Sequence, residues 1–291
     1  MVVRARFPKP TDRVPAEPDG DEWDSWKSRL LNRLPYVRWL RQREQAKSRE
    51  IEVLRESLVR LSEAPFQSFG AALEQARQEV TAHAPVGEYA LRYRAEEPLY
   101  WLPIPSWIAE WAARTGPRRI LDIGSGYGTL AVFISIVTRA RVFCLDTEPW
   151  RLAQPLRQRY DIEVVGGNVE LIEIPWQEPM DAVLMTEVIE HFNFHPVPTM
   201  RKVAQALTPG GRLFMSTPDA ASWGKLTDPY SDYRDMPYPD PALPTVDRHV
   251  YQFTEDEIVS VLNESGFEIE RLTRAPGRWG LHLNVDATRS A

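Results

Sequence analysis

Residues 119–128 read RILDIGSGYG, a short apolar run that leads into three glycines at alternate positions. Ile120, Leu121 and Ile123 are apolar and partly β-branched, as a buried parallel strand requires. The glycines allow a sharp turn and a close approach of the backbone to a ligand. The apolar run 129–136 that follows predicts a buried helix, whose first N–H groups would point at whatever lies on the turn.

Two kinds of ligand-binding turn compete for this motif. A dinucleotide-binding turn has the pattern G-x-G-x-x-G/A, and its third small residue would fall here on Thr129. The sequence instead carries Asp-x-Gly-x-Gly-x-Gly, beginning at Asp122, which resembles the first motif of class I S-adenosylmethionine (SAM) methyltransferases. A glycine turn that binds no ligand is the third interpretation, and it weakens as further matches appear downstream.

The bulk composition argues against several classes of protein. The chain of 291 residues has a net charge of −6, which gives no general electrostatic reason to bind nucleic acid. A single cysteine, Cys144, excludes a disulfide within the chain and a cysteine-based zinc site. We see no signal peptide and no apolar run as long as a membrane span, so we expect a cytoplasmic protein.

Composition divides the chain into three parts. Residues 1–20 are rich in proline and charge and predict a disordered tail. Residues 21–95 predict a helical N-terminal extension, and residues 96–291 predict a doubly wound, mostly parallel, Rossmann-like α/β domain. In that domain we expect strands at 120–123, 141–145, 162–165, 180–185, 212–218, 267–272 and 281–285, and helices at 106–114, 129–136, 148–160 and 254–265.

The segment 27–49 is unusually basic, because it contains many lysines and arginines and only one acidic residue, Glu44. Apolar residues are interleaved with these charges, which indicates either an interfacial helix on anionic lipid or a patch for an anionic substrate. The alternative, which we favour, is a helix whose apolar face packs on the catalytic domain or on a second subunit. The apolar spacing of Ile51, Leu54, Leu58 and Leu61 likewise allows a homo-oligomer.

The resemblance to the methyltransferases extends over residues 99–272 and implies where the cofactor lies. Asp146 ends the second expected strand, where folds of this type hold ribose hydroxyls. Asn168 and Val169 follow the third strand and match the positions that read adenine, while Asp122 would orient the ammonium group of SAM. The resemblance therefore implies SAM as cofactor, bound by Asp122, Gly124, Ser125, Gly126, Gly128, Asp146, Asn168, Val169 and Glu187.

A second motif, TEVIEH at residues 186–191, follows the fourth expected strand. If the motif is helical, Glu187, Glu190 and His191 lie on one face. The string EVIEH resembles the ubiquinone-biosynthesis O-methyltransferases. Its E-x-x-E-H core also matches the small-RNA 3′-end 2′-O-methyltransferases, and both families associate these residues with a divalent metal. His249 precedes a Phe-Thr helix start and would complete the set.

The resemblance thus implies that Glu187, Glu190, His191 and His249 hold Mg²⁺ or Mn²⁺. The same string also occurs in methyltransferases without a metal, where the acid and the histidine form hydrogen bonds near the fourth strand. His83, His195 and His282 have no comparable sequence context.

The sequence therefore predicts methyl transfer from SAM to oxygen, with a small-molecule, glycan or lipid-linked hydroxyl as acceptor. Glu190, His191 and His249 are the catalytic candidates. RNA is the alternative acceptor that the metal motif suggests. Two other classes stay open: a non-catalytic SAM-binding protein that interacts through its N-terminal helices, and a nicotinamide-dependent oxidoreductase, which Thr129 disfavours. The insert 219–246 is long and rich in proline and aromatic residues. Its aromatic residues either wall the acceptor or pack within a surface loop.

Overall fold

The structure is a computed structural model that describes residues 64–84, 89, 93–225 and 229–290. All of them belong to the second of the two units into which the chain divides, Glu50–Ala291. The tail predicted over 1–20, the helices expected before residue 64 and the basic segment 27–49 lie outside the described residues. Within the described ranges, no helix has the length and apolarity needed to cross a membrane.

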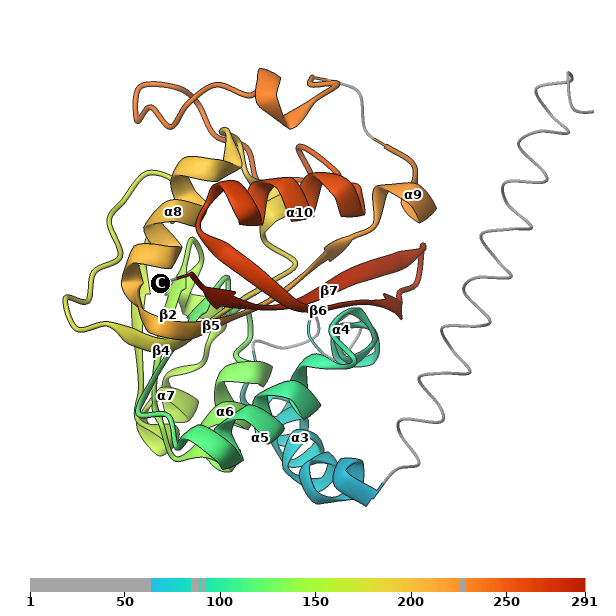
Figure 1. Ribbon diagram of the computed structural model, residues 1–291. Coiled ribbons are helices and arrows are strands. Elements are labelled where there is room, and N and C mark those ends of the chain that lie inside the picture. The colour runs from blue at the N-terminus through green and yellow to red at the C-terminus, as the bar shows by residue number, and fades with distance from the viewer. Residues whose placement is uncertain (1–63, 85–88, 90–92, 226–228, 291) are drawn as a thin grey trace, which may run out of the picture. The chain divides into compact units, whose positions relative to one another are not determined.

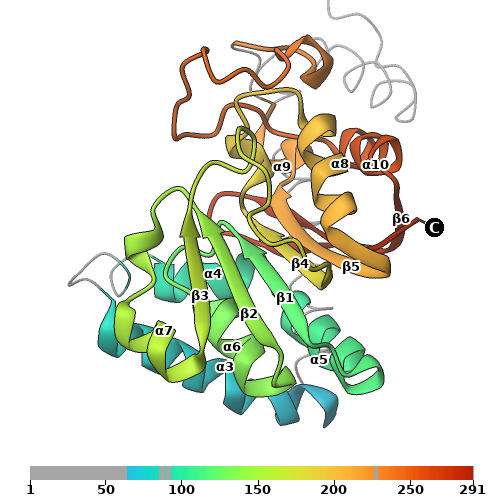
Figure 2. The same ribbon diagram turned by 90° about the vertical axis from the view of Figure 1, so that its left-hand side faces the viewer.

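The described residues form one seven-stranded sheet with the strand order β3-β2-β1-β4-β5-β7-β6 (Figures 1 and 2). The strands are β1 (Arg119–Ile123), β2 (Arg141–Asp146), β3 (Ile162–Gly166), β4 (Met180–Thr186), β5 (Leu207–Pro218), β6 (Phe267–Pro276) and β7 (Leu281–Arg289). The pairs among β1 to β5 are parallel, whereas β7 is antiparallel to both β5 and β6. The predicted doubly wound, mostly parallel sheet is confirmed.

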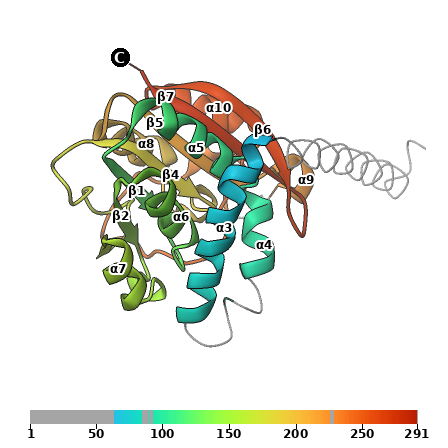
Figure 3. The same cartoon turned by 90° about the horizontal axis from the view of Figure 1, so that it is seen from below.

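Helices cover both faces of this sheet (Figure 1). One face carries α3 (Ala64–His83), α5 (Ile104–Thr115), α6 (Thr129–Thr138) and α7 (Gln154–Tyr160). The other face carries α8 (Pro196–Ala206) and α10 (Glu255–Glu264). Helix α4 (Arg94–Tyr100) lies beside α3 (Figure 3), and the Arg77 guanidinium of α3 donates to the Arg94 carbonyl at 2.6 Å. The short elements are η2 (Pro149–Arg151), η3 (Ile189–His191), α9 (Ala220–Trp223) and η4 (Tyr233–Asp235).

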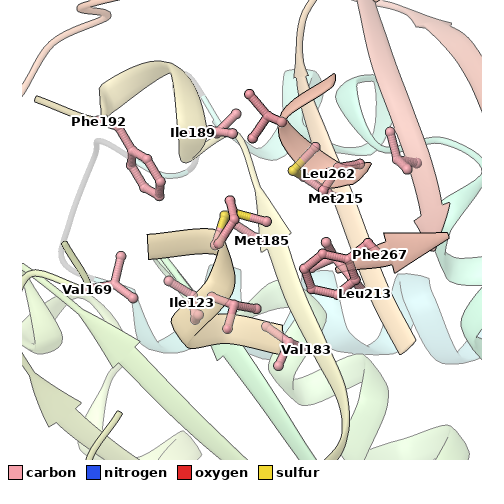
Figure 4. Packing of buried hydrophobic residues seen from close by; sticks show 14 of the residues in the cluster. Ile123, Val169, Val183, Met185, Ile189, Phe192, Leu213, Met215, Leu262 and Phe267 are labelled. Atoms are coloured by element: carbon pink, nitrogen blue, oxygen red, sulfur yellow. The ribbon is translucent and has the colours of Figure 1, made fainter. Parts of the chain in front are cut away.

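Alternate residues of the central strands point to opposite faces of the sheet, so each strand contributes to two hydrophobic clusters. Ile120 and Leu184 are buried in the cluster under α5 and α6. Leu121 and Val183 are buried in the cluster under α8 and α10. Figure 4 shows part of this second cluster. Leu262 of α10 belongs to it together with the strand residues Ile123, Val183, Met185, Leu213 and Phe267. Because both faces are covered, the central strands are mostly apolar, and Asp122 of β1 is a buried polar residue among them.

Two expected elements differ from the structure for local reasons. The helix expected over 148–160 is interrupted, because Ala153 is extended and the chain resumes helical geometry only at α7, with Pro155 in its first turn. The strand expected over 212–218 begins earlier, at Leu207, and its pairing with β4 shifts register between Met180 and Ala182. Helices α4 and α8 were not predicted. The helix expected over 254–265 is α10, which begins with a capping box of Thr254 and Glu257.

Candidate active site

A cleft of about 780 Å³ opens where β1, β2, β3 and β4 end. This is the edge at which open α/β sheets bind ligands, and the volume falls in the range of small-molecule sites. Its lining includes the residues that end or follow each of these strands, namely Ile123, Gly124, Leu145, Asp146, Gly167, Asn168, Thr186 and Glu187. The sheet topology therefore brings both sequence motifs to one cavity.

The glycine turn forms one wall of this cleft. Gly124 and Gly126 have φ angles of 72° and 52°, in the left-handed region that favours glycine. A Cβ atom on Gly124 would lie 2.3 Å from the Cγ2 atom of Val188, whereas a Cβ atom on Gly126 would meet nothing within 4 Å. Gly124 is therefore required for packing, and Gly126 faces open space in the cleft. Gly128 caps α6 and does not belong to the cleft lining.

Two buried carboxyl groups lie beside the turn. Asp122 is 2% exposed, and its Oδ1 atom has no hydrogen-bond partner among the described residues. Burial, and then the nearby Asp146, raises the pKa of the Asp122 carboxyl to about 8. Asp146 accepts the N–H groups of Gly126 at 2.8 Å and of Glu148 at 2.7 Å. Asp146 thus fixes the glycine turn against β2, while each of its oxygens keeps a lone pair for a ligand.

Asn168 and Val169 lie on the cleft beyond β3, as predicted. The Oδ1 atom of Asn168 accepts the N–H of Glu170 at 2.8 Å, which shapes the turn that follows the strand. Val169 is 5% exposed and packs into the core below. Asn168 and Val169 therefore form a polar and an apolar surface at the far end of the cleft from β4.

The motif TEVIEH is not a helix, so the condition under which Glu187, Glu190 and His191 would share one face is not met. Glu187 has a φ of 56°, and a short 3-10 turn begins only at Ile189. The chain leaves β4 through this left-handed residue, whose N–H donates to the Ser216 carbonyl at 2.9 Å and whose Oε1 accepts the Ser216 hydroxyl at 2.7 Å. Non-glycine residues in this conformation are strained and cluster at functional sites. The Glu187 carboxylate consequently contacts Ser216 and His282 and is not part of the group formed by Glu190, His191 and His249.

Glu190, His191 and His249 do come together, with ligand atoms that all lie within 4.8 Å of one another. His249 reaches the other two because the N–H of Val250 donates to the Glu190 carbonyl at 2.8 Å. The Glu190 carboxyl is fully buried, and its Oε2 accepts the Thr217 hydroxyl at 3.0 Å. Its Oε1 has no partner in the described part of the chain. Three of the four predicted ligands therefore form a cluster, and Glu187 lies outside it.

The cluster favours uncharged forms of its buried members. Burial, and then Glu187, raises the pKa of the Glu190 carboxyl well above its usual range. Burial, and then the His191 ring, lowers the pKa of His249. His191 is more exposed, and its Nδ1 lies 3.1 Å from the Asp247 carboxylate. Both shifts favour the uncharged forms, so the cluster combines an acid that is harder to ionise with an imidazole that is harder to protonate than usual.

His282, for which the sequence offered no context, lines the same cleft. It is 1% exposed, and its Nδ1 lies 2.8 Å from Oε2 of Glu187. Its ring stacks on Tyr100 with 4.6 Å between centroids and meets the edge of Trp223 at 5.3 Å. Glu187 is thus held by Ser216 on one oxygen and approached by His282 on the other. No local signal marks His282, because only the pairing of β7 with β5 brings it to the cleft.

Helix α4 also contributes Glu96, Glu97 and Tyr100 to the cleft, and its N-cap residue Tyr93 lines the cleft as well. Few aromatic residues of the insert line the cleft. Trp223 lines the cleft, but Tyr233 is buried in the core and Tyr238 is 70% exposed, stacked on His195. Most aromatic residues of 219–246 therefore do not wall the acceptor, because its tyrosines pack on the neighbouring helices and loops instead.

Comparison with known proteins identifies the domain. Residues 92–272 match a family model described as a methyltransferase domain. Among solved structures, magnesium protoporphyrin IX methyltransferase from Synechocystis, with SAM bound, is 17% identical with a TM-score of 0.49, covering 74% of this chain and 90% of that chain. The [4+2]-cyclase SpnF is 12% identical with a TM-score of 0.50, covering 75% and 93%.

A third similar structure spans nearly the whole chain. The 1,6-didemethyltoxoflavin-N1-methyltransferase of Burkholderia thailandensis, with 1,6-didemethyltoxoflavin and S-adenosylhomocysteine bound, is 17% identical with a TM-score of 0.45, covering 97% of this chain and 94% of that chain. No curated protein sequence matches significantly. The family match spans more than half of the chain and sets aside the oxidoreductase interpretation. This chain belongs to the methyltransferase domain family and is a class I SAM-dependent methyltransferase.

Proposed function

We propose that this enzyme methylates an oxygen atom of a small-molecule, glycan or lipid-linked hydroxyl acceptor. The observation that carries the proposal is the cluster of Glu190, His191 and His249 on the wall of the cleft, beside the ends of β4 and β5. A hydroxyl is a weak nucleophile until it loses its proton, and the partly buried His249 imidazole, whose pKa is lowered, can take that proton. The E-x-x-E-H string that resembles the ubiquinone-biosynthesis O-methyltransferases supports the same choice of acceptor.

The residues around the glycine turn fit SAM. The unpartnered Oδ1 of Asp122 and the open space before Gly126 leave room for a polar ligand with a cationic group. Bound SAM supplies the methyl group together with its own leaving group. Asp146, Asn168 and Val169 would hold the adenosine part, so that the chain mainly positions the two reactants. His249 would accept the acceptor proton as the oxygen bonds to carbon, and Glu190 would orient the hydroxyl.

The cluster also fits a divalent metal. Three ligand atoms within 4.8 Å of one another can share one ion at roughly 2.0–2.6 Å each. One carboxylate and two imidazoles suit Mn²⁺ better than Mg²⁺, which prefers oxygen ligands. If the metal binds, Glu190, His191 and His249 would hold it, and the ion would acidify an acceptor hydroxyl.

The charge of the cleft favours a neutral or cationic acceptor over RNA. Carboxylates such as Glu96, Glu187 and Asp247 outnumber the guanidinium groups of Arg151 and Arg278 in the lining. Phosphates would be repelled by this surface, since nucleic-acid sites are lined by lysine and arginine. Contact of 27–49 with a membrane surface, and assembly through the N-terminal helices, are further proposals that rest on the sequence alone.

The proposal is tested by methyl transfer from labelled SAM to a panel of phenols, catechols, glycans, lipid-linked alcohols and amines. We expect label on hydroxyl oxygen. His249→Ala should lower the rate by about 100-fold or more, the size of general-base effects, while SAM affinity in calorimetry stays unchanged. Transfer to amines alone, or full activity of His249→Ala, would contradict the proposal.

The metal is tested separately on the same acceptor. If an ion is needed, EDTA should abolish transfer and Mn²⁺ should restore it in the wild type, but not in Glu190→Gln. If the cluster acts as a simple base, EDTA should have no effect, and His191→Ala should alter the pH–rate profile instead.

A further inference from the structure

Glu97 is a cleft carboxylate to which the sequence motifs assign no role. It lies on α4, and it lines the cleft together with Asp122 and the glycine turn. Burial raises the pKa of its carboxyl to about 7. An acid that is hard to ionise in the empty cleft becomes easier to ionise when a cation binds beside it.

Two hydroxyl groups fix the position of Glu97. The Tyr89 hydroxyl donates to Oε1 at 2.6 Å, and the Thr129 hydroxyl donates to the same atom at 2.7 Å. Both bonds fall on Oε1, and none of the described residues donates to Oε2. Thr129 is the first residue of α6, directly after the glycine turn. The carboxylate is thus anchored where the turn becomes a helix, with its second oxygen available to a ligand.

The orientation of the cofactor follows from the sheet. Asp146 ends β2, where folds of this type hold ribose, so the adenosine part extends over β2 and β3. The amino-acid end of SAM must then lie across the end of β1, toward Asp122 and Glu97. Of the two cationic groups in SAM, only the ammonium carries N–H donors, because the sulfonium has none. A fixed carboxylate with a free oxygen is the partner that such a donor requires.

We propose that Glu97 binds the ammonium group of SAM, so that α4 completes the cofactor site. The proposal depends on SAM binding and is independent of the acceptor. It also assigns a positioning role to Thr129. This residue stands where a dinucleotide-binding turn would need a small residue, and its hydroxyl holds Glu97 in place.

The test is calorimetry of wild type and Glu97→Gln at pH 8 with three ligands. SAM and S-adenosylhomocysteine both carry the ammonium group, whereas 5′-methylthioadenosine lacks the amino-acid end. We expect Glu97→Gln to weaken SAM and S-adenosylhomocysteine equally, by about 10-fold or more, as loss of a charged hydrogen bond does. Its affinity for 5′-methylthioadenosine should equal that of the wild type.

Glu178→Gln is the matched control, because it makes the same change at an exposed carboxylate outside the cleft lining. Three results would overturn the proposal: unchanged SAM affinity, a loss confined to SAM, or an equal loss for 5′-methylthioadenosine. A loss confined to SAM would place Glu97 at the sulfonium, and an equal loss would make it a structural support. A wild type that binds none of the three ligands would refute the cofactor itself.

Discussion

Gly124 and Gly126 lie two residues apart in one turn, but Gly124 is needed for packing and Gly126 for access to the cleft. A methyl group on Gly124 would overlap Val188, while one on Gly126 would project into the open cleft. We expect Gly124→Ala to lower the unfolding temperature clearly. Gly126→Ala should cost only the roughly 1–2 kcal/mol of a non-glycine residue at positive φ, but it should weaken SAM binding about 10-fold or more. Thermal unfolding and calorimetry of both variants check this, and the reverse pattern would contradict the geometry.

The buried Asp122 carboxyl lowers the free energy of unfolding at neutral pH. Its folded pKa is about 8, whereas an unfolded aspartate titrates near 3.9. Between these values the folded chain holds a proton that the unfolded chain releases, so the free energy of unfolding falls as pH rises. Asp122→Asn removes this decrease in the free energy of unfolding. Without SAM, the variant should therefore unfold several degrees above the wild type at pH 8 and close to it at pH 4.

Thermal unfolding of Asp122→Asn at both pH values measures the effect, with Glu178→Gln as the control. The same variant should bind SAM more weakly, because it loses a carboxylate that faces the ligand. An equal difference in unfolding temperature at pH 4 and pH 8 would show that the Asp122 carboxyl does not titrate as stated.

The sequence predicts the cleft residues that belong to a motif or directly follow an expected strand or precede an expected helix, and it misses those that lack such a local signal. Asp122, Gly124 and Gly126 were predictable, because strand, turn and helix follow one another along the chain. Glu97 and His282 were not. Glu97 depends on the packing of an unpredicted helix against Thr129, and His282 depends on the antiparallel register that places it opposite Pro218.

At the scale of elements, hydrophobic pattern predicts the strands well because both faces of the central sheet are covered. The strands expected at 120–123, 162–165 and 180–185 differ from β1, β3 and β4 by one residue at an end. Irregular connections are harder, because single residues decide them. Glu187 adopts a left-handed conformation that its residue type does not predict. This conformation bends the chain directly after β4. That bend directs Glu187 toward His282 and leaves Glu190 with His191 and His249.

The antiparallel end of the sheet has its own determinant. Asp286 of β7 is fully buried, and its carboxylate accepts Arg212 of β5 at 2.8 Å and Arg271 of β6 at 3.0 Å. One carboxylate thus ties three strands together, and such a buried charge is tolerated because both oxygens are paired. This link sets β7 between β5 and β6, and the start of β7 carries His282 to the cleft.

At the scale of the whole molecule, the cleft-lining residues among those that the structure describes lie between Tyr93 and His282. Helix α3 begins at Ala64 and packs on α5, α6 and α7. A chain that begins at Ala64 therefore keeps the sheet, both helical layers and every cleft-lining residue that the structure describes. We expect removal of residues 1–63 to leave SAM affinity in calorimetry within about twofold, which is about 0.4 kcal/mol. A larger loss would show that the first 63 residues take part in the cofactor site.

The same truncation tests the role of the N-terminal residues. Leu54, Leu58 and Leu61 form an apolar face in the sequence pattern, and an apolar helical face is stabilised only when another surface covers it. If that surface is a second copy of the chain, sedimentation should show an oligomer for the full chain and a monomer after removal of 1–63, while removal of 1–20 alone should change nothing.

Salt-sensitive cosedimentation of the full chain with anionic vesicles, lost in the longer truncation, would instead assign the basic segment 27–49 to a lipid surface. Identical sedimentation and vesicle binding in all three chains would contradict both roles and leave packing on the chain's own catalytic domain.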